Sequence, residues 1–403
     1  MLYDLANTIF VFGVITLYFP TWLVVERGFP DSALALATAL AGMVVILVSP
    51  WVGARTDHHG RRLPTLVGTT SVTIVATALL ATLPPAQSLW LLGVALVGFH
   101  VGSVVYDALL PDVSTPANRG LVSGVGVGVG YVGSFLALGI GTLALTGLDL
   151  GYPAVFRAIA AGFLVFALPS FLLVRERPRL PLTGAAPGLA RVAASLAGSW
   201  RRALGYPGVT RFLVSRFLYT DAINTLILFV AVYAQAELGF DLEGSTLLVG
   251  TAILVAVAGG VAAGRLVDRV GPGLMLRVVL VLWMATILAT VGAALTGATW
   301  AAWLIGPASG LALGGTWTAD RVLMARISPP RHLGEFYGLY ATVGRFASVL
   351  GPLVWGAIVD LLGWGRNAAM IALAAFIGLA LLVLRPVDDR SPTWGPDELE
   401  MLS

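Results

Sequence analysis

The sequence predicts an all-α polytopic membrane protein with twelve transmembrane helices in two pseudo-symmetric six-helix halves. Three observations predict this class. The chain is 58% hydrophobic and only 11% charged, whereas a soluble domain carries roughly 25% charged residues. Apolar runs of about 20 residues recur from end to end, and each is long enough to cross a bilayer as a helix. A basic connecting segment then divides these runs six and six.

A transmembrane β-barrel is the structural rival, but it needs segments of about 10 residues that alternate strictly between polar and apolar. The runs here are longer and apolar all round, which favours helices. The chain has no cysteine, which excludes disulfides and cysteine-based metal sites. Its net charge of +3 indicates no basic surface for nucleic acid. We therefore expect no cofactor, no metal and no nucleic-acid partner.

The predicted spans are separated by arginine, proline, glycine and aspartate residues. They lie at 4–25, 33–54, 63–83, 88–111, 119–146, 153–174, 209–235, 245–266, 273–296, 299–325, 333–360 and 366–384. The longest gap falls between the sixth and seventh spans. This predicts an N-terminal six-helix bundle at 1–174, a cytoplasmic linker at 175–208, a C-terminal bundle at 209–384 and a cytoplasmic tail at 385–403.

Arginine placement predicts the orientation, because short cytoplasmic loops carry an excess of basic residues. The loops after the even-numbered spans are rich in arginine, whereas alternate loops such as "LPPAQS" and "TGAT" are almost uncharged. Both termini are therefore expected in the cytoplasm of a chain that crosses the cell membrane. The opening "MLYDLANTIFVF" lacks a basic region and a cleavage site, so we expect a retained span there and not a signal peptide.

The linker carries its own pattern. Leu189, Val192, Leu196 and Trp200 recur at helical spacing, and arginines occupy other positions of the helical wheel. This predicts a short amphipathic helix on the inner leaflet. A plain connecting helix is the alternative, and the pattern does not separate the two.

An internal repeat supports the division into two halves. "GARTDHHG" at Gly53 and "GRLVDRVG" at Gly264 share the pattern G-x-x-x-D-x-x-G, and each follows the second span of its half. Repeated halves are typical of secondary transporters. A different motif, G-x-G-x-x-G at 128–133, lies inside an apolar span without the strand that a dinucleotide site requires. Its small residues instead favour close helix packing.

Several ordered segments resemble one family. "GARTDHHGRR" is similar to the cytoplasmic gate motif of the major facilitator superfamily, with His58 where a basic Arg or Lys is usual. "YDLANTIF", "YDALLPD", "RFLYTDAINT" and "EFYGLYATVGRFASVLGPLVWG" resemble successive segments of its vacuolar amino-acid effluxer-like family. The chain departs from the usual residues at Leu5, Asp107, Ala222 and Asp320. The added acids at Asp107 and Asp320 put the coupling ion and the charge of the cargo in doubt.

The resemblance implies that the first, fourth, seventh and tenth spans line a central cavity. Polar residues at membrane depth crowd onto these same four spans, which is an independent indication. The candidate substrate-binding residues are Asn7, His100, Tyr106, Tyr219, Asp221, Asn224, Trp317 and Arg345. The candidate proton-coupling acids are Asp107, Asp221 and Asp320, and the candidate gating residues are Asp57, Arg61, Arg62, Asp268 and Arg269.

Each assignment has an alternative. Asp4, Asp107, Asp320 and Arg321 lie near span ends, where snorkelling and gate salt bridges are common. His100 is also compatible with a hydrogen-bonded packing residue, and Arg216, which lies about two turns into its span, with snorkelling to the interface.

Asp221 and Asn224 lie deeper in the seventh span. They are three residues apart and share a face of their helix, so we expect them to point into a wet pathway. We expect Arg345 to lie close enough to balance the charge of Asp221.

These observations favour a secondary active transporter that works by alternating access. The resemblance implies export of a small zwitterion such as an amino acid, and buried acids indicate coupling to protons. We expect a monomer that handles a small-molecule substrate, protons and membrane lipid. An exporter of amphiphilic drugs or lipids is the main alternative. A non-transporting receptor or scaffold lacks a soluble module here, and no catalytic constellation supports an enzyme.

Overall fold

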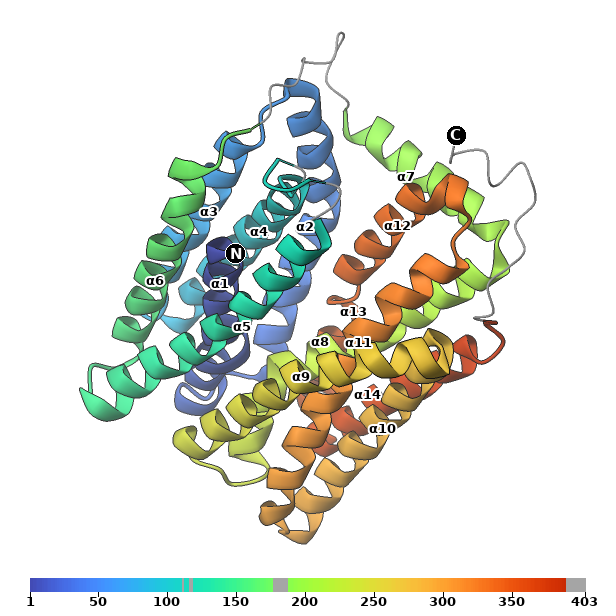
Figure 1. Ribbon diagram of the computed structural model, residues 1–403. Helices are drawn as coiled ribbons and strands as arrows, with labels where there is room; N and C mark the ends of the chain where they lie inside the picture. The colour runs from blue at the N-terminus through green and yellow to red at the C-terminus, as the bar shows by residue number, and fades with distance from the viewer. Residues whose placement is uncertain (111, 116–118, 177–187, 389–403) are drawn as a thin grey trace. The chain divides into compact units, whose positions relative to one another are not determined.

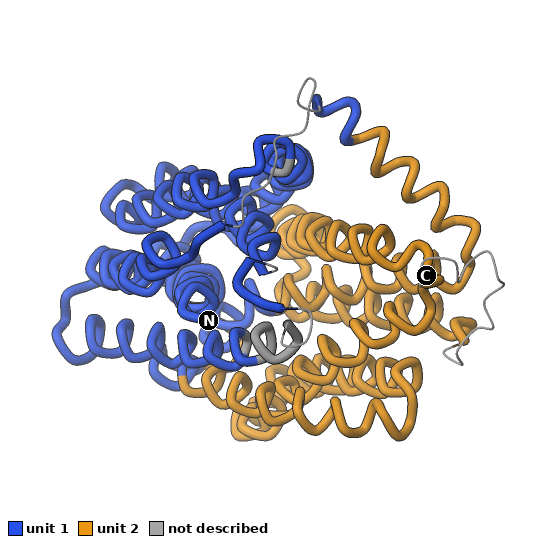
Figure 2. The backbone as a smooth tube through the Cα atoms, turned by 45° about the horizontal axis from the view of Figure 1, so that its top comes forward, with its two compact units in different colours: residues 1–192, 227–236, 240–246 blue, residues 193–226, 237–239, 247–403 orange. Residues whose placement is uncertain are grey.

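The computed structural model describes residues 1–110, 112–115, 119–176 and 188–388, and every regular element in these ranges is helical (Figure 1). The chain forms two compact units, which are coloured separately in Figure 2. Unit 1 comprises residues 1–192, 227–236 and 240–246, and unit 2 comprises residues 193–226, 237–239 and 247–403.

The elements of the first half occur in the following order. They are α1 (Leu2–Phe10), the π-helical η1 (Val11–Tyr18) and η2 (Thr21–Glu26), α2 (Asp31–His59), α3 (Leu63–Leu79), α4 (Pro85–Ala108), α5 (Arg119–Thr142), the π-helical η3 (Leu143–Gly147) and α6 (Tyr152–Leu173). The predicted linker helix is α7, Leu189–Leu204.

The elements of the second half follow a similar order. They are α8 (Pro207–Ala236), α9 (Leu242–Val270), α10 (Pro272–Thr296), the 3-10 turn η4 (Thr299–Ala301), α11 (Ala302–Ile327), the 3-10 turn η5 (Pro330–His332), α12 (Leu333–Phe346), α13 (Leu350–Gly356), the π-helical η6 (Ala357–Leu361) and α14 (Gly365–Leu384).

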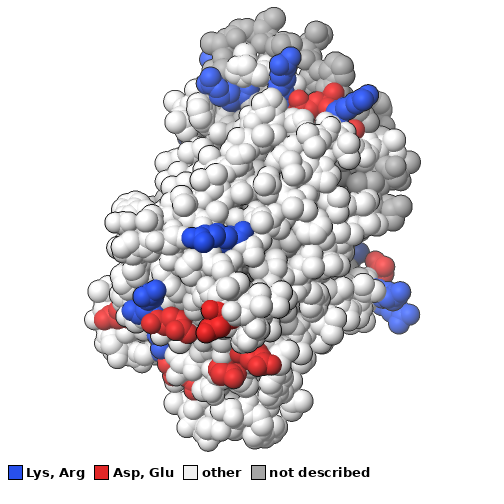
Figure 3. Space-filling view, turned by 90° about the vertical axis from the view of Figure 1, so that its left-hand side faces the viewer, with Lys and Arg blue, Asp and Glu red and all other residues white. Residues whose placement is uncertain are grey.

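Each predicted span coincides with one helix or one consecutive run of helices. In the described part of the chain, ten such runs are long and apolar enough to cross a membrane, and α3 is a shorter apolar helix. Figure 3 shows a wide, mostly uncharged area that one basic patch interrupts, with further charged side chains gathered away from it. That distribution suits a surface whose uncharged part contacts lipid. The prediction of an all-α membrane protein is confirmed.

Two helices extend further than predicted. The expected loops after 33–54 and 245–266 begin later, because α2 continues to His59 and α9 continues to Val270. The G-x-x-x-D-x-x-G repeat therefore lies on the last helical turns and not in loops. Its final glycines, Gly60 and Gly271, have φ angles of 68° and 88°. Glycine adopts this left-handed conformation without a steric cost, so it ends each helix at the same place in the repeat.

The eleventh span differs from the prediction of one helix at 333–360. The helix is interrupted at 347–349, between α12 and α13. Pro352 explains the interruption, because its ring lacks an N–H and collides with the carbonyl four residues earlier in a continuous helix. We call this segment the 347–349 break.

Helix α5 packs against α1 through glycines. A side chain at Gly133 would collide with the backbone carbonyl of Leu5, and one at Gly130 would lie 3.2 Å from the Thr8 hydroxyl. Two helices approach this closely only where one of them carries no Cβ atom. The G-x-G-x-x-G motif thus serves helix packing in unit 1.

We predict that Gly133→Ala lowers the stability of the protein by about 1–3 kcal/mol, because the added methyl group must displace the α1 backbone. Gly139→Ala on the same helix is the matched control, since nothing lies within 4 Å of a Cβ atom at that position. Thermal unfolding of the purified protein, followed by tryptophan fluorescence, measures both. Equal melting temperatures for the two variants contradict the prediction.

Candidate functional site

A buried polar cluster in unit 2 joins three spans around the carboxylate of Asp320 on α11. The guanidinium of Arg216 on α8 lies 3.3 Å from this carboxylate. The hydroxyl of Tyr219 donates to Oδ2 of Asp320 at 3.2 Å, and the hydroxyl of Tyr340 on α12 donates to Oδ1 at 2.9 Å. The second partner of Arg216 is the Thr220 hydroxyl at 3.2 Å. We call these five residues the Asp320 cluster.

Four of the five residues of the Asp320 cluster are buried, and Tyr340 is half-buried. Asp320 and Tyr219 are 0% exposed and Arg216 is 6% exposed. The guanidinium of Arg216 also stacks over the Tyr340 ring, with 3.6 Å between its central carbon and the ring centroid. A buried charge is tolerated only when it is paired and hydrogen-bonded, and here each charge has the other together with hydroxyl or aromatic partners. The Nε atom of Arg216 alone has no hydrogen-bond partner among the described residues.

Helical spacing positions these side chains. Arg216, Tyr219 and Thr220 are three and four residues apart on α8, so they share the face that meets α11 and α12. Gly344 on α12 leaves room for the guanidinium, because a Cβ atom there would lie 3.0 Å from Arg216 Nη2. The sequence pattern thus brings Arg216 to Asp320. Because Arg216 pairs with Asp320 inside the protein, snorkelling to the membrane interface is not needed to satisfy its charge.

Unit 1 has a second polar cluster on α1 and α4. The Tyr106 hydroxyl donates to Asp4 Oδ2 at 2.6 Å, and the rings of Tyr3 and Tyr106 lie 4.4 Å apart. Tyr3 shares a hydrogen bond of 2.7 Å with Thr70 on α3. The Oδ1 atom of Asn7, one turn further along α1, is buried and has no hydrogen-bond partner among the described residues.

Asp221 and Asn224 share one face of α8, as predicted from their spacing. Asp221 is 0% exposed, and Asn224 donates from Nδ2 to the carbonyl of Ala347 at 2.6 Å. Neither carboxylate oxygen of Asp221 has a hydrogen-bond partner among the described residues, and the expected proximity of Arg345 stays a prediction. Asn224 is thus bonded to the 347–349 break, and Asp221 lies beside the start of α13.

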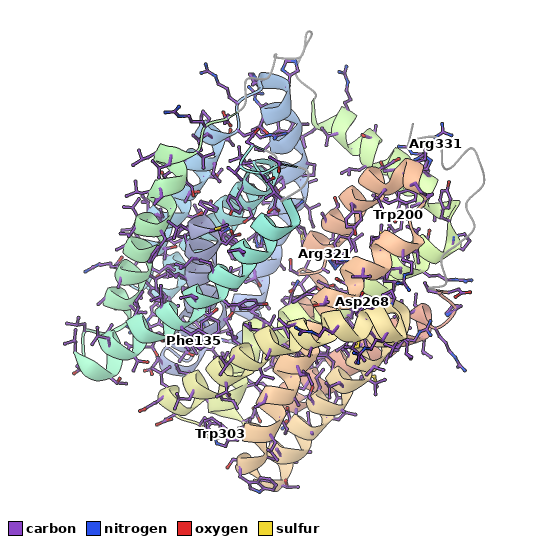
Figure 4. The ribbon with its side chains drawn as sticks, in the orientation of Figure 1. Phe135, Trp200, Asp268, Trp303, Arg321 and Arg331 are labelled. Carbon is purple, nitrogen blue, oxygen red and sulfur yellow. The ribbon has the colours of Figure 1, made fainter. Side chains whose placement is uncertain are left out.

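The other candidate substrate and coupling residues are more exposed. His100 on α4 is half-buried beside Phe99, at 5.2 Å between ring centroids. Trp317 and Arg345 are also half-buried. Asp107 is exposed, unlike Asp221 and Asp320. Arg321, the neighbour of Asp320 and labelled in Figure 4, is exposed, whereas Asp320 is fully buried.

The candidate gating residues lie at the ends of α2 and α9. Arg62 donates from Nη1 to the carbonyl of Ala108 at 2.5 Å, which ties the start of α3 to the end of α4. Arg61 is exposed, and so are Asp268 (Figure 4) and Arg269 on the last turn of α9. No ion pair joins Asp268 to another described residue. The side chain of Asp57 lies outside the described part of the structure.

The linker helix α7 is attached to the start of the eleventh span. Arg202 donates from Nε to both carboxylate oxygens of Glu335, at 2.8 and 3.0 Å, and its Nη2 also contacts this carboxylate. His332 lies 3.4 Å from the same group. The amphipathic pattern predicted α7, but not this contact, because Glu335 is far away in sequence.

Sequence reasoning missed Tyr340 and Thr220 as members of the Asp320 cluster. Thr220 directly precedes Asp221, and a threonine in an apolar span is far less conspicuous than the charged residue next to it. Tyr340 follows Tyr337 by three residues and precedes Gly344 by four, so the three share a helical face. This shared face, with its two tyrosine hydroxyls, was the sequence feature that could have indicated a polar contact of the eleventh span.

Comparison with solved structures places the fold. The chain resembles a single-residue mutant of the nucleoside transporter NupG with a TM-score of 0.76, at 11% identity over 96% of this chain and 98% of that one. It resembles a D-xylose-proton symporter with a TM-score of 0.75, at 14% identity over 98% of both chains. These likenesses show that the chain has the fold of these solved transporters. The family description "Vacuole effluxer Atg22 like" matches residues 29–392, and the chain belongs to this family.

Relatives agree with this placement. The chain is 26% identical to an uncharacterised MFS-type transporter, YxiO of Bacillus subtilis, over 96% of this chain and 94% of that protein. It is 27% identical to autophagy-related protein 22 of Coccidioides immitis over 66% of this chain, and the match covers 47% of the fungal protein. The predicted membership of the vacuolar effluxer-like family is confirmed.

We predict that Asp320→Asn destabilises the protein by about 3–5 kcal/mol, because it leaves the Arg216 charge buried without its counter-charge. The double variant Arg216→Gln/Asp320→Asn removes both charges and should regain part of that loss. Thermal unfolding of the single and double variants measures the coupling. Arg321→Gln is the matched control, since this neighbouring arginine is exposed. Strictly additive effects of the two substitutions contradict the prediction.

Proposed function

We propose that this protein is a proton-coupled exporter of amino acids or similar zwitterions. The observation that carries the proposal is the Asp320 cluster, in which an acid and a base lie buried 3.3 Å apart. Intramembrane ionisable residues of this kind usually mark substrate or proton pathways. The family description, which refers to an effluxer, supports the outward direction.

The charges of a zwitterion match those of the cluster. An ammonium group suits the Asp320 carboxylate, and a carboxylate suits the planar guanidinium of Arg216, whose Nε atom is without a partner in the described structure. A cargo molecule with both groups replaces the internal ion pair without leaving either charge unmatched. Tyr219, and Tyr106 in unit 1, are further cargo-binding candidates, as are Asn7, His100, Trp317 and Arg345.

Exchange follows when cargo and proton compete for one carboxylate. A proton on the acid releases the cargo ammonium group, and loss of the proton restores the cargo site. Asp320 and Asp221 are both fully buried and fit this role, whereas the exposed Asp107 fits a gating role better. In this proposal the protein is a monomer in the cytoplasmic membrane, with both termini in the cytoplasm and lipid around its spans.

The test is uptake into proteoliposomes from a panel of radiolabelled amino acids, with and without a pH gradient. We expect accumulation of at least one neutral amino acid that depends on the gradient. Asp320→Asn should abolish both this accumulation and counterflow exchange, because it removes the carboxylate for which cargo and proton compete. Asp107→Asn is the comparison variant and should retain accumulation. If Asp320→Asn and Asp221→Asn both still concentrate cargo on a pH gradient, proton coupling through these acids is wrong.

A second test concerns gating. We propose that Asp57 and Asp268, at equivalent places in the repeat, hold one conformation with the neighbouring Arg61, Arg62 and Arg269. Asp57→Asn or Asp268→Asn should shift the inward–outward balance and leave folding intact. The chain has no native cysteine, so labelling of single cysteines introduced on either side of the membrane reports this balance directly. Asp149→Asn, in an exposed loop, is the control. Unchanged labelling in both gate variants contradicts the proposal.

Export of amphiphilic drugs or lipids is the second candidate function. An apolar pocket of about 730 Å³ in unit 1 favours it, with walls from α2, α3 and α4 that include Leu40, Val72 and Val97. The same vesicles loaded with a fluorescent amphiphilic cation distinguish the two candidates. Transport of the dye without transport of any amino acid would favour this second function.

A further inference from the structure

The 347–349 break leaves backbone groups without helical partners inside a membrane span. The last carbonyls of α12 and the first N–H groups of α13 have lost their i→i−4 partners there. Water is absent from the bilayer core, so each unpaired group costs several kcal/mol unless the protein satisfies it. A broken span therefore needs partners from a neighbouring helix.

Helix α8 supplies a group of the right polarity to each side of the break. On the α12 side, Asn224 donates from Nδ2 to the carbonyl of Ala347 at 2.6 Å. On the α13 side, the Asp221 carboxylate lies beside the first turn of the helix, because a Cβ atom at Gly351 would be 3.0 Å from its Oδ2, although neither carboxylate oxygen has a hydrogen-bond partner among the described residues. The Asn224 amide thus bonds to the free carbonyl of Ala347, and the Asp221 carboxylate, which is an acceptor, lies near the free N–H groups at the start of α13.

Gly351 is what allows the two helices to meet. A Cβ atom at this position would lie 3.0 Å from both the backbone oxygen and Oδ2 of Asp221, and still closer to the Thr225 hydroxyl. Thr225 itself donates to the Asp221 carbonyl at 2.7 Å, so its hydroxyl is fixed. Pro352 interrupts the helix, and Gly351, which has no side chain, lets the interrupted segment pack closely against α8.

The first half contains the same motif in another setting. D-x-x-N-T occurs at Asp4–Thr8 on α1 and again at Asp221–Thr225 on α8. In both copies the threonine donates to the aspartate carbonyl, and each copy lies against a glycine of the fifth span of its half. However, α5 is unbroken from Arg119 to Thr142. Only the second copy faces a helix break.

We propose that Asp221 and Asn224 are positioning residues for transport, which hold the 347–349 break as a hinge between α12 and α13. The inference rests on the proposed transport function and adds a moving part to it. Helix α12 carries Tyr340, whose hydroxyl bonds to Asp320. A swing of α12 about the hinge therefore makes or breaks one of the contacts that hold the carboxylate of Asp320.

The experiment measures the hinge without cargo. Leu333 and Leu361 lie at opposite ends of the eleventh span and are 37% and 80% exposed, and the native chain has no cysteine. Spin labels on cysteines introduced at both positions report the distance across the break in reconstituted protein. We expect Asn224→Ala to widen the distance distribution roughly twofold, because the freed carbonyl finds new local partners. Asn7→Ala, the same substitution in the motif that faces unbroken α5, should leave it unchanged.

A rescue variant separates positioning from general damage. Pro352→Ala restores the missing N–H and allows another helical turn to form across the break. We expect it to narrow the distribution by itself and to reverse the widening in Asn224→Ala/Pro352→Ala. The proposal is overturned if Asn224→Ala and Pro352→Ala both leave the distribution unchanged, or if Asn7→Ala widens it equally. Because the measurement uses neither cargo nor a pH gradient, failure of amino-acid transport leaves this result interpretable.

Discussion

Backbone hydrogen bonding inside the bilayer is the constraint on which the rest of this structure depends. Without water, every N–H and C=O group at membrane depth needs a partner in the protein. This constraint makes the described elements helical, and it also explains the few polar side chains at depth. Asn224 is bonded to the broken backbone of the eleventh span, and Asp221 lies beside the same break. The constraint extends to charge, since Arg216 and Asp320 are buried only because they neutralise one another.

The two halves use similar sequences for different purposes. The first span of each half contains a D-x-x-N-T segment, and each half contains a helix that ends at a glycine of the same repeat. In unit 1 the acid of that segment is bonded by Tyr106, whereas in unit 2 the acid lies beside a helix break. The buried arginine–aspartate pair is found on α8 and α11 of unit 2. Among the described residues, the second half holds more buried charged side chains than the first, namely Arg216, Asp221 and Asp320 compared with Asp31.

Fold and topology could be predicted from the sequence because apolar runs of membrane length dominate it. Polar residues on the seventh and tenth spans were also found, since their presence at depth is costly and conspicuous. Their partners were not. The spacing of Asp221 and Asn224 predicted a common face correctly. Polar side chains on such a face can line a cavity or bond to a helix break, and the spacing does not distinguish the two. Pro352 was visible, yet its effect on α8 depends on which helices meet, and no local pattern contains that information.

The ion pair between Arg202 and Glu335 connects the linker helix to the eleventh span. Helix α7 is held by this ion pair to the first turn of α12, within the half of the eleventh span that precedes the break. Arg202 is exposed, so ionic strength screens the pair and weakens it. The attachment of the linker helix to this half of the eleventh span is therefore expected to weaken as the salt concentration of the surrounding solution rises.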